Sequence, residues 1–538
     1  MNILNKVILS SFLQISLMNK KLGMKKVLYF LTILGSLLSF GCQHPATRPV
    51  SEAEQWDIHE IVLKGRASDN PYTDVELSAT FSLNDQHFTV PGFYDGDSTY
   101  RIRFSPPATG EWFYITKSNE KELSGQEGNF NCLPSSEENH GPLKIVNTFY
   151  LEYADGTPFY SIGTTAYQWV SAEQKLQEKT IETLQSSPFN KIRMGVFPKY
   201  YQFGNQTEPW LHPFKRENNQ SDYTQPEYEY FRNLDKRIRQ LMEMGIQADV
   251  ILFHPYDNWG YSQMGKENNE RYVRYMIARF SAYRNVWWSL ANEWNVPAIK
   301  DTIDWEGIGI LLQKEDPHQR LRGIHNWRST EDHFYDHTRE WITHVSTQTS
   351  EFYNAIKWRN QYQKPLLFDE MRYEGDIPRS WGDLTAEQMS SYFWMAGLSG
   401  GYPTHGDTYN HSNDSSIEAR FWAKGGIMPG KSPERIAFFK SVMEHAPVKE
   451  MIPELVGDNP LNRNENIYIF SKPGTYYLAY TASKNKTIEL ELEGEAGYKL
   501  EVMDTWNMEV VEDTVVNSGT FSYQTKIPYT ALRLYYEQ

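Results

Sequence analysis

The sequence has little positive charge for its length. Its 538 residues include 53 Lys and Arg against 68 Asp and Glu, which gives a net charge of -15 and a pI near 5.5. Nucleic acids and anionic membrane surfaces bind basic protein faces, so this balance argues against both as partners. A chain of this length cannot be one small domain. The length predicts two to four domains, or one large barrel with smaller domains attached to it.

Cysteine is nearly absent, since Cys42 and Cys132 are the only two. Cys42 ends the stretch MKKVLYFLTILGSLLSFGC (24–42), which has a basic start, an apolar centre and a small residue before the cysteine. This pattern predicts a secretory signal, too short and too closely followed by polar sequence to be a stable membrane span. We therefore expect residues 1–42 to be a signal segment outside the fold, with Met24 a more natural translation start than Met1.

The end of this signal, Ser39-Phe40-Gly41-Cys42, resembles a bacterial lipobox, in which the cysteine is lipidated after cleavage. The resemblance implies an exported lipoprotein of a Gram-negative bacterium, in the periplasm or at the outer membrane. Its only membrane attachment would be the lipid on Cys42. With Cys42 lipidated, Cys132 has no partner, and neither a disulfide framework nor a cysteine metal site can form.

The pattern of apolar and polar residues changes twice along the rest of the chain. Residues 43–55 are polar and contain Pro, and we expect a tether. Residues 56–141 are short alternating runs separated by Asn, Asp, Gly and Pro, which predicts a β-sandwich. The same pattern returns over 451–538 and predicts a second small β-domain, also a sandwich. The first β-domain could bind carbohydrate or brace a catalytic domain, and bracing is the favoured interpretation.

Between these domains, residues 142–450 alternate short apolar runs with amphipathic helical stretches such as 228–245 and 270–283. The runs are 158–167, 190–198, 247–255, 285–295, 319–326, 342–349, 364–375 and 398–408. Eight repeats over some 300 residues are typical of a (β/α)8 barrel, with a doubly wound sheet as the structural alternative. No Gly-rich phosphate loop follows any run, so nothing indicates a nucleotide site.

Active sites of such barrels form where the strands end, so the polar residues that close each run are informative. Six runs carry them: Arg193, His254, Asn292-Glu293, His325-Asn326, Asp369-Glu370, and His405 with Asp407. Three histidines at strand ends could bind zinc or iron, but no close His-x-His or His/Glu spacing supports a preformed metal site. We therefore predict no metal and no cofactor.

Glu293 and Glu370 end the fourth and seventh runs, which places them across the barrel mouth from each other. Hydrolysis of a glycosidic bond with retention needs two carboxyl groups about 5–5.5 Å apart. One must be ionised as the nucleophile, and the other must hold a proton for the leaving oxygen. Trp288 and Trp294 could supply apolar walls that raise the pKa of Glu293. Aromatic residues, 14% of the chain, fit a site that stacks sugar rings.

This pair of glutamates, with Asn292 before the first, resembles clan A retaining glycoside hydrolases. The sequences EMRYEG (370–375) and GGYPTHG (400–406) are similar to those of apiosidase-like barrel families of Bacteroidetes, whose barrels lie between two β-domains. The resemblance covers most of the mature chain. It implies cleavage of O-glycosidic bonds in a polysaccharide or oligosaccharide, with Glu293 as acid/base, Glu370 as nucleophile and Asn292 on the sugar 2-hydroxyl. These relatives often have Asp where Glu293 stands, which implies a different sugar.

Other residues near these motifs have competing interpretations. Strand alternation puts Asp369 on the side opposite Glu370, so only one of them should face the barrel interior. Glu374 is a further candidate nucleophile. Trp287 and Trp288 alternate, so one should face the interior and the other the helices. The candidate substrate-binding residues are Asn292, Arg193, His254, His325, Trp294, Tyr373, His405 and Trp422.

Two alternatives to a hydrolase remain open on the sequence alone. One is a non-catalytic glycan-binding surface lipoprotein, and the other is a transglycosylase on the same scaffold. Neither sugar nor linkage follows from the sequence, because the loops that select substrate vary freely on a barrel.

Overall fold

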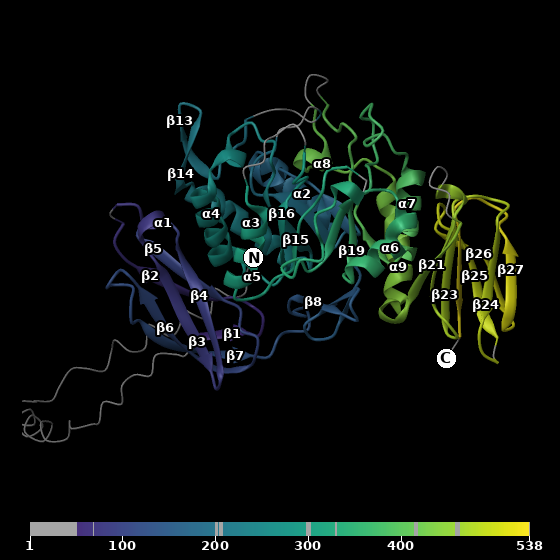
Figure 1. The fold of residues 1–538 in the computed structure, drawn as a ribbon, viewed down its shortest axis with the longest axis horizontal. Coiled ribbons are helices and arrows are strands. Elements are labelled where there is room, and N and C mark those ends of the chain that lie inside the picture. Colours follow the sequence, from purple (N-terminus) through teal and green to yellow (C-terminus); the bar gives the residue numbers. More distant parts are fainter. Residues whose placement is uncertain are drawn as a thin grey trace, which may run out of the picture. The chain divides into compact units, whose positions relative to one another are not determined.

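A computed structural model of the chain describes residues 51–536, except 68, 200–202, 204–207, 297–302, 329–330, 414–417, 458–462 and 496. The expected signal segment, Cys42 and the first part of the expected tether lie outside the described residues. Among the described helices, none has both the length and the apolar character needed to cross a membrane. Strands predominate in the purple N-terminal and yellow C-terminal segments, and helices in the teal-to-green segment between them (Figure 1).

The N-terminal segment forms a seven-stranded sheet in the order β1-β7-β6-β3-β4-β5-β2. Its elements are β1 (Ser51–Glu54), β2 (His59–Lys64), α1 (Pro71–Asp74), β3 (Leu77–Leu83), β4 (Gln86–Tyr94), β5 (Thr99–Phe104), β6 (Gly110–Ser118) and β7 (Glu127–Leu133). Because β1 pairs in parallel with β7, residues 51–54 belong to this sheet, and the expected tether to residue 55 is too long.

The strand β4 turns this sheet into a sandwich. Its first six residues pair with β3 and its last three pair with β5, so β2 and β5 fold over the other strands. Gly92 lies at the change of partner, where a Cβ atom would come within 2.7 Å of the Leu77 side chain. Phe81 and Phe104 then stack at 4.3 Å between the two layers, beside the buried Trp112. This is the expected N-terminal β-sandwich.

Buried charges join this sandwich to helices of the central segment. Arg103 of β5 donates to the carboxylate of Asp235 at 2.7 Å and to the carbonyl of Arg279 at 2.8 Å. Arg279 in turn donates to Asp95 at the end of β4, at 2.8 Å. All four side chains are largely buried, so each charge depends on its partners. These contacts support the bracing interpretation of the first β-domain.

The central segment contains a barrel of eight parallel strands. They are β11 (Gly163–Thr165), β12 (Lys191–Gly195), β15 (Gln247–Phe253), β16 (Val286–Ala291), β17 (Arg322–Gly323), β18 (Val345–Gln348), β19 (Leu366–Glu370) and β20 (Gly401–Pro403). Each lies in one of the eight predicted runs. The first five form one sheet and the last three another, and the bridges Gly163↔Thr404 and His325↔Ser346 join the sheets on both sides. The predicted (β/α)8 barrel is confirmed.

Helices follow most of these strands. They are α2 (Gln174–Gln185), α3 (Tyr228–Glu243), α4 (Lys266–Phe280), α5 (Trp305–Glu315), α6 (Ala355–Tyr362), α7 (Ala386–Leu398), α8 (Phe421–Lys424) and α9 (Ser432–His445). Between β17 and β18 the described residues form only the 3-10 turn η3 (Glu331–His333), so the expected alternation is incomplete there. Along α3, Phe231, Leu234 and Ile238 share the buried face that the sequence predicted.

Smaller elements complete the central segment. The strands β8 (Leu143–Val146), β9 (Tyr150–Tyr153) and β10 (Pro158–Phe159) form an antiparallel sheet that leads into the barrel, and β13 (Phe214–Glu217) pairs with β14 (Gln220–Pro226) in a hairpin after β12. The other 3-10 turns of this segment are η1 (Trp169–Ser171), η2 (Tyr261–Gln263), η4 (Phe352–Asn354) and η5 (Val448–Glu450), and η6 (Arg463–Glu465) belongs to the C-terminal segment.

The C-terminal segment is a second β-sandwich, as expected. A six-stranded sheet, β21-β22-β23-β28-β25-β26, lies with the pair β24-β27 around one apolar core. Its strands are β21 (Ile452–Val456), β22 (Ile467–Lys472), β23 (Tyr476–Thr481), β24 (Thr487–Leu492), β25 (Tyr498–Asp504), β26 (Glu509–Val516), β27 (Gly519–Gln524) and β28 (Thr530–Tyr535). Tyr480 stacks on Trp394 of α7 at 5.6 Å and donates to Ser391 at 2.8 Å, which attaches this domain to the barrel.

Candidate active site

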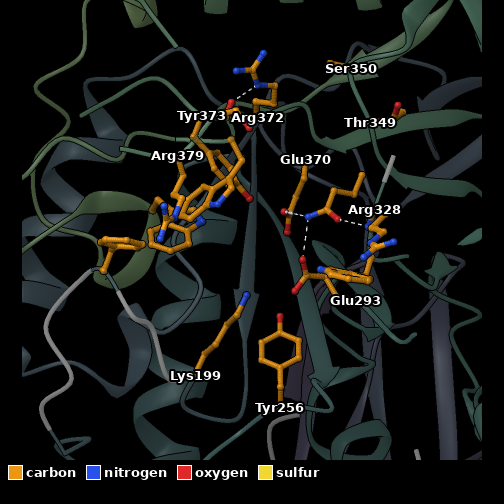
Figure 2. A pocket seen from close by; sticks show the side chains of 16 residues that line it. Lys199, Tyr256, Glu293, Arg328, Thr349, Ser350, Glu370, Arg372, Tyr373 and Arg379 are labelled. Atoms are coloured by element: carbon orange, nitrogen blue, oxygen red, sulfur yellow. Dashed lines mark hydrogen bonds between the residues drawn. The ribbon is translucent and has the colours of Figure 1, made fainter. Parts of the chain in front are cut away.

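A pocket of about 520 Å³ lies where the barrel strands end (Figure 2). Its lining residues come from the segments that follow β12, β15, β16, β17, β18, β19 and β20. They are Lys199, Phe203, Tyr256, Glu293, Trp327, Arg328, Gln348, Thr349, Ser350, Glu370, Arg372, Tyr373, Arg379, Ser380, Trp381 and Trp422. Both predicted catalytic glutamates are therefore in one cavity.

The two glutamates are bridged by a single amide group. The side-chain nitrogen of Gln348 donates to Glu293 Oε1 at 2.9 Å and to Glu370 Oε2 at 2.7 Å. Since both bonds share one nitrogen, the two carboxylate oxygens lie within 5.6 Å of each other, the sum of the two lengths. In Figure 2 the carboxylates of Glu293 and Glu370 point toward one another.

Glu293 is placed by a sharp turn after β16. Its backbone is left-handed, with φ of 54°, a conformation that costs a non-glycine residue on the order of 1–3 kcal/mol. The Glu293 N–H donates to His325 Nδ1 at 3.4 Å, and the next residue, Trp294, donates its N–H to the His325 carbonyl at 3.0 Å. The end of β17 thus holds the turn that aims Glu293 into the pocket.

Glu370 is placed by a β-bulge at the end of β19. Thr347 pairs with Phe368, but the next residue, Gln348, pairs with Glu370, so Asp369 is an extra residue in the strand. Asp369 accepts from Lys191 at 2.6 Å across the barrel, and Arg193 lies 3.9 Å away. Asp369 and Glu370 therefore both face the interior, and the expectation from simple alternation is wrong.

The surroundings push the pKa values of the two glutamates apart. Burial raises the pKa of Glu293, and the negative charge of Glu370 adds to the rise despite Lys199 nearby. Burial would also raise the pKa of Glu370, but the cations Lys199 and Arg193 and the hydrogen bond from Tyr167 outweigh it and lower the value. Glu293 is thus the group that tends to hold a proton, and Glu370 the group that tends to be ionised.

Arg193 and Asn292 form the floor beneath these carboxylates. Arg193 is fully buried, with Nη1 3.7 Å from Glu370 Oε1 and 3.4 Å from the hydroxyl of Tyr167. Tyr167 itself donates to Glu370. Asn292 accepts from Arg193 at 3.3 Å and donates to the hydroxyl of Tyr256 at 2.8 Å. Both predicted residues are adjacent to the catalytic pair, although neither lines the pocket.

The three predicted histidines lie behind the pocket wall. His254 contacts the carbonyl of Pro198 at 3.0 Å, and burial lowers its pKa to about 4. Burial also lowers the pKa of His325 to about 3, so this ring is neutral and orients the Glu293 turn. His405 stacks on Phe189 at 4.8 Å, away from the pocket. The expectation that His405 lines the sugar site is wrong, because the end of β20 turns its ring into the core.

Aromatic side chains line one side of the pocket. Trp422 and Tyr373, both predicted, lie 5.8 Å apart between ring centres, and Trp381 lies 5.4 Å from Trp422. Trp294 is not among them, because its ring packs edge-on against Tyr335 at 5.2 Å. The expectation that Trp294 forms an apolar wall beside Glu293 in the pocket is therefore wrong.

The two tryptophans of β16 point to opposite sides, as the alternation predicted. Trp287 donates to Gln247 at 3.1 Å and lies under the amine of Lys191, 5.4 Å from its ring centre. Trp288 donates to Asp316, after α5, at 2.9 Å. Both are buried, and neither lines the pocket, so Trp288 does not shield Glu293 either.

Glu374 is not the nucleophile, because its carboxylate is hydrogen-bonded to backbone groups away from the pocket. Its carboxylate accepts from the backbone N–H groups of Lys431 and Ser432, at 2.8 and 3.3 Å, where α9 begins. Asp407 accepts from the N–H of Gly430 at 2.8 Å beside it, and burial raises the pKa of Asp407 to about 8. Neither carboxyl group lines the pocket, so Glu370 is the one that faces Glu293.

Several site residues were not predicted from the sequence, although they also lie at or just after the ends of barrel strands. Gln348 is the next-to-last residue of the sixth predicted run, Tyr167 ends the first, and Lys199 follows the second closely. Polar groups at those strand ends were the available signal. Phe203, Trp327 and Trp381 lie on loops, where no periodicity indicates which side chains turn inward. Among the described residues, no group of three or more His, Cys, Asp or Glu side chains could hold a metal ion.

Comparisons with known proteins show the family to which the chain belongs. A family model described as "Apiosidase-like, catalytic domain" matches residues 146–429. Two domains of unknown function flank it, DUF5060 over residues 52–119 and DUF5605 over residues 466–535. No protein of curated function matches the chain in sequence.

Two solved structures from Bacteroides vulgatus extend the comparison. A candidate glycoside hydrolase is 34% identical, with a TM-score of 0.82, and the match covers 90% of this chain and 99% of that chain. A glycoside hydrolase of family 5 is 16% identical, with a TM-score of 0.57 and coverage of 74% and 94%, and shows a shared fold. The resemblance inferred from the strand-end glutamates is confirmed, and the chain belongs to the apiosidase-like family and is a glycoside hydrolase.

Proposed function

We propose that this glycosidase works by a retaining double displacement, with Glu370 as nucleophile and Glu293 as acid/base. The observation that carries the proposal is the shared hydrogen bond of Gln348, which keeps the two carboxylate oxygens within 5.6 Å. Retaining enzymes have carboxyl groups about 5–5.5 Å apart, whereas inverting enzymes need about 6.5–9.5 Å to admit a water molecule. The opposite pKa shifts of the two groups support the same assignment.

In the first step a carboxylate oxygen of Glu370 attacks the anomeric carbon while the bond to the leaving oxygen breaks. Glu293 transfers its proton to that oxygen, so the leaving sugar departs as an alcohol. In the second step Glu293, now ionised, takes a proton from water, whose oxygen attacks the anomeric carbon and releases Glu370. Arg193 and Tyr167 hold Glu370 ionised before the attack. Asn292 is the proposed contact of the sugar 2-hydroxyl.

The first experiment determines the anomeric form of the initial product by proton NMR, with an aryl-glycoside and polysaccharide screen to find a substrate. Retention is expected, and an inverted product would overturn the mechanism. A 2-fluoro-glycoside inactivator of the right sugar should then label the peptide that contains Glu370. Labelling at Glu374 would contradict the assignment of the nucleophile.

Glu293→Ala tests the acid/base. It should lose most activity on poor leaving groups, retain more on activated aryl glycosides, and yield a glycosyl azide of retained configuration when azide is added. Glu374→Gln is the matched control for loss of a buried carboxylate outside the pocket, and no azide rescue is expected there. Equal losses on good and poor leaving groups for Glu293→Ala would argue against its role.

The non-catalytic interpretation predicts another outcome. If the wild-type chain binds glycans but hydrolyses none of a broad panel, and Glu293→Gln with Glu370→Gln changes nothing, the chain is a glycan-binding protein. Product analysis with added acceptor sugars would reveal a transglycosylase. We also propose that the chain is an exported lipoprotein. Metabolic labelling with a palmitate analogue should mark the wild type and not Cys42→Ala, and equal labelling of both would refute the anchor.

A further inference from the structure

The pocket has a charge balance opposite to that of the chain. Four of its lining residues are cations, Lys199, Arg328, Arg372 and Arg379, and the only acids among the lining residues are Glu293 and Glu370. The whole chain has a net charge of -15. Arg372 pairs with Asp383 at 3.5 Å, so with Glu293 protonated for catalysis the ionised Glu370 stands against Arg328, Arg379 and Lys199, and a cleft with an excess of cations concentrates anions.

Arg328 is an exposed residue that contacts two other residues lining this pocket. Its guanidinium lies 4.1 Å from the ring centre of Trp327, and its backbone N–H donates to Gln348 Oε1 at 2.7 Å. The same Gln348 bridges the two catalytic glutamates. The backbone of Arg328 is left-handed, with φ of 72°, which is strained for a residue with a Cβ atom. The fold therefore keeps an arginine in an unfavourable conformation directly beside the catalytic pair.

Arg379 lies on the other side of the two carboxylates in the view of Figure 2. Its side chain is exposed and lies 5.9 Å from the ring centre of Phe203, beside Trp381. Neither Arg328 nor Arg379 forms an ion pair with a carboxylate of the described residues. Most other arginines around the barrel, Arg279 for example, do have carboxylate partners. Guanidinium groups held at a cavity without a counter-ion are suited to a carboxylate or sulfate of a ligand.

Lys199 adds positive charge inside the pocket. It is 8% exposed and lies between the rings of Tyr167 and Tyr256, 4.3 and 5.0 Å from their centres. Burial lowers the pKa of Lys199, and the charges of Glu293 and Glu370 oppose that fall. Thr349 and Ser350, which line the same cavity, bring hydroxyl groups that can donate to an anion. The anion-binding groups thus extend from the reacting centre to the rim.

From this arrangement we propose that the substrate is an acidic glycan, whose sugar next to the cleaved bond carries a carboxylate or a sulfate ester that Arg328 binds. Arg379 binds a second anionic group on the opposite side of the pocket. The inference rests on the proposed hydrolase function, and it names the substrate class of that same site. A uronic acid and a sulfated sugar share the chemistry that the arginines recognise, and the experiment separates them.

A neutral glycan fits this pocket less well for a physical reason. Binding a sugar displaces water from the guanidinium groups, and a neutral ring returns no negative charge in exchange. Sites built to pair a ligand group reject the analogue that lacks it, because their own polar groups are left unpaired. Discrimination should therefore appear as a difference between matched acidic and neutral forms of one glycan.

The experiment uses matched pairs of oligosaccharides. Uronic-acid oligosaccharides from pectin, alginate and glucuronoxylan are each compared with their carboxyl-reduced neutral forms, and carrageenan oligosaccharides with their desulfated forms. Calorimetry on the Glu370→Gln protein measures binding without turnover. The best acidic member should bind about 10- to 100-fold more tightly than its neutral form, as a charge-assisted hydrogen bond implies. Which pair shows the difference identifies the anion.

Arginine variants connect that difference to the pocket. Arg328→Gln, made in the same background, should bring the ratio of the two dissociation constants, neutral form over acidic form, close to one. Arg379→Gln should reduce it in part. Arg274→Gln is the matched control, because this α4 arginine pairs with Glu270 and Glu315 at the surface. Added salt should weaken the acidic form alone.

The outcomes distinguish this inference from the proposed function. Equal binding of acidic and neutral forms, no binding of any acidic member, or equal loss of both forms in Arg328→Gln would each overturn the acidic-substrate inference. Hydrolysis of a neutral glycoside with retention would leave the mechanism intact in that case. Tight, Arg328-dependent binding of an acidic glycan that the wild type never cleaves would instead refute the hydrolase and keep the anion site.

Discussion

Lys191 and Asp369 form an ion pair 2.6 Å long inside the barrel, one residue before the proposed nucleophile. The side chains of both are about 1% exposed, so neither charge can be solvated if the other is removed. Asp369 faces this way only because the bulge at the end of β19 adds a residue to the strand. The pair therefore fixes the strand end from which Glu370 enters the pocket.

Removing one partner of this pair should destabilise the barrel. We expect Asp369→Ala to lower the free energy of unfolding by about 3–5 kcal/mol, because the buried cations Lys191 and Arg193 are then left to share the single carboxylate of Asp249. The double change Lys191→Met with Asp369→Leu should cost less than the two single changes together. Urea denaturation measures each value, and Glu182→Gln, on the exposed face of α2, is the control. Additive losses would show that the two residues act independently.

The pH dependence of kcat/KM should be bell-shaped, with limbs set by the two glutamates. Activity needs Glu370 ionised, so it falls as the pH drops through a pKa that lies below the usual glutamate value. It also needs Glu293 protonated, so it falls as the pH rises through a pKa that lies above that value. An acid limb above the ordinary glutamate range would contradict the assignment of Glu370.

Gln348→Met tests what the shared amide does to these limbs. The amide stabilises both carboxylates in their charged form, and without it both pKa values should rise. The two limbs should then move to higher pH by about half to one unit, since a hydrogen bond of about 0.5–1.5 kcal/mol corresponds to that shift. Gln86→Met in the N-terminal sandwich is the control. An unchanged profile with reduced kcat would mean that Gln348 only packs in the pocket.

The buried charges between the N-terminal sandwich and the barrel lead to another expectation. Asp235→Asn should lower the free energy of unfolding by about 3–5 kcal/mol, because Arg103 and Arg279 lose their common carboxylate. KM should change little, because none of these residues lies at the pocket. Denaturation and steady-state kinetics measure the two effects, with Glu127→Gln on exposed β7 as control. A large rise in KM without loss of stability would favour a glycan-binding role for this domain.

The aromatic side of the pocket should contribute to substrate binding. Trp381→Ala should raise KM about 2- to 10-fold with a smaller effect on kcat, since a stacking contact is worth about 0.5–1.5 kcal/mol. Trp506→Ala, in the C-terminal sandwich, is the matched control. A fall in kcat with unchanged KM would place Trp381 in the chemical step instead of in sugar binding.

The sequence predicted the repeated architecture better than the local geometry. The eight apolar runs contain the eight barrel strands because parallel strands buried on both faces leave a clear pattern. The bulge at Asp369 could not be predicted, because period-two alternation assumes that no residue is inserted. His405 and Trp294 were misplaced for a related reason: a strand end indicates that a side chain is near the mouth, but the following turn decides where it points. Arg328 and Arg379 come from loops, where no period applies.

Three charged residues around the pocket, Glu293, Arg328 and Arg372, have left-handed backbones with φ of 54°, 72° and 79°. Glycine would adopt each of these conformations without strain. A selection for heat resistance alone should therefore favour glycine at positions such as 328. The selected protein would unfold at a higher temperature but bind its substrate more weakly. At these positions a substitution that raises thermal stability lowers activity. Substitutions that stabilise the protein without this loss must therefore be sought elsewhere in the chain.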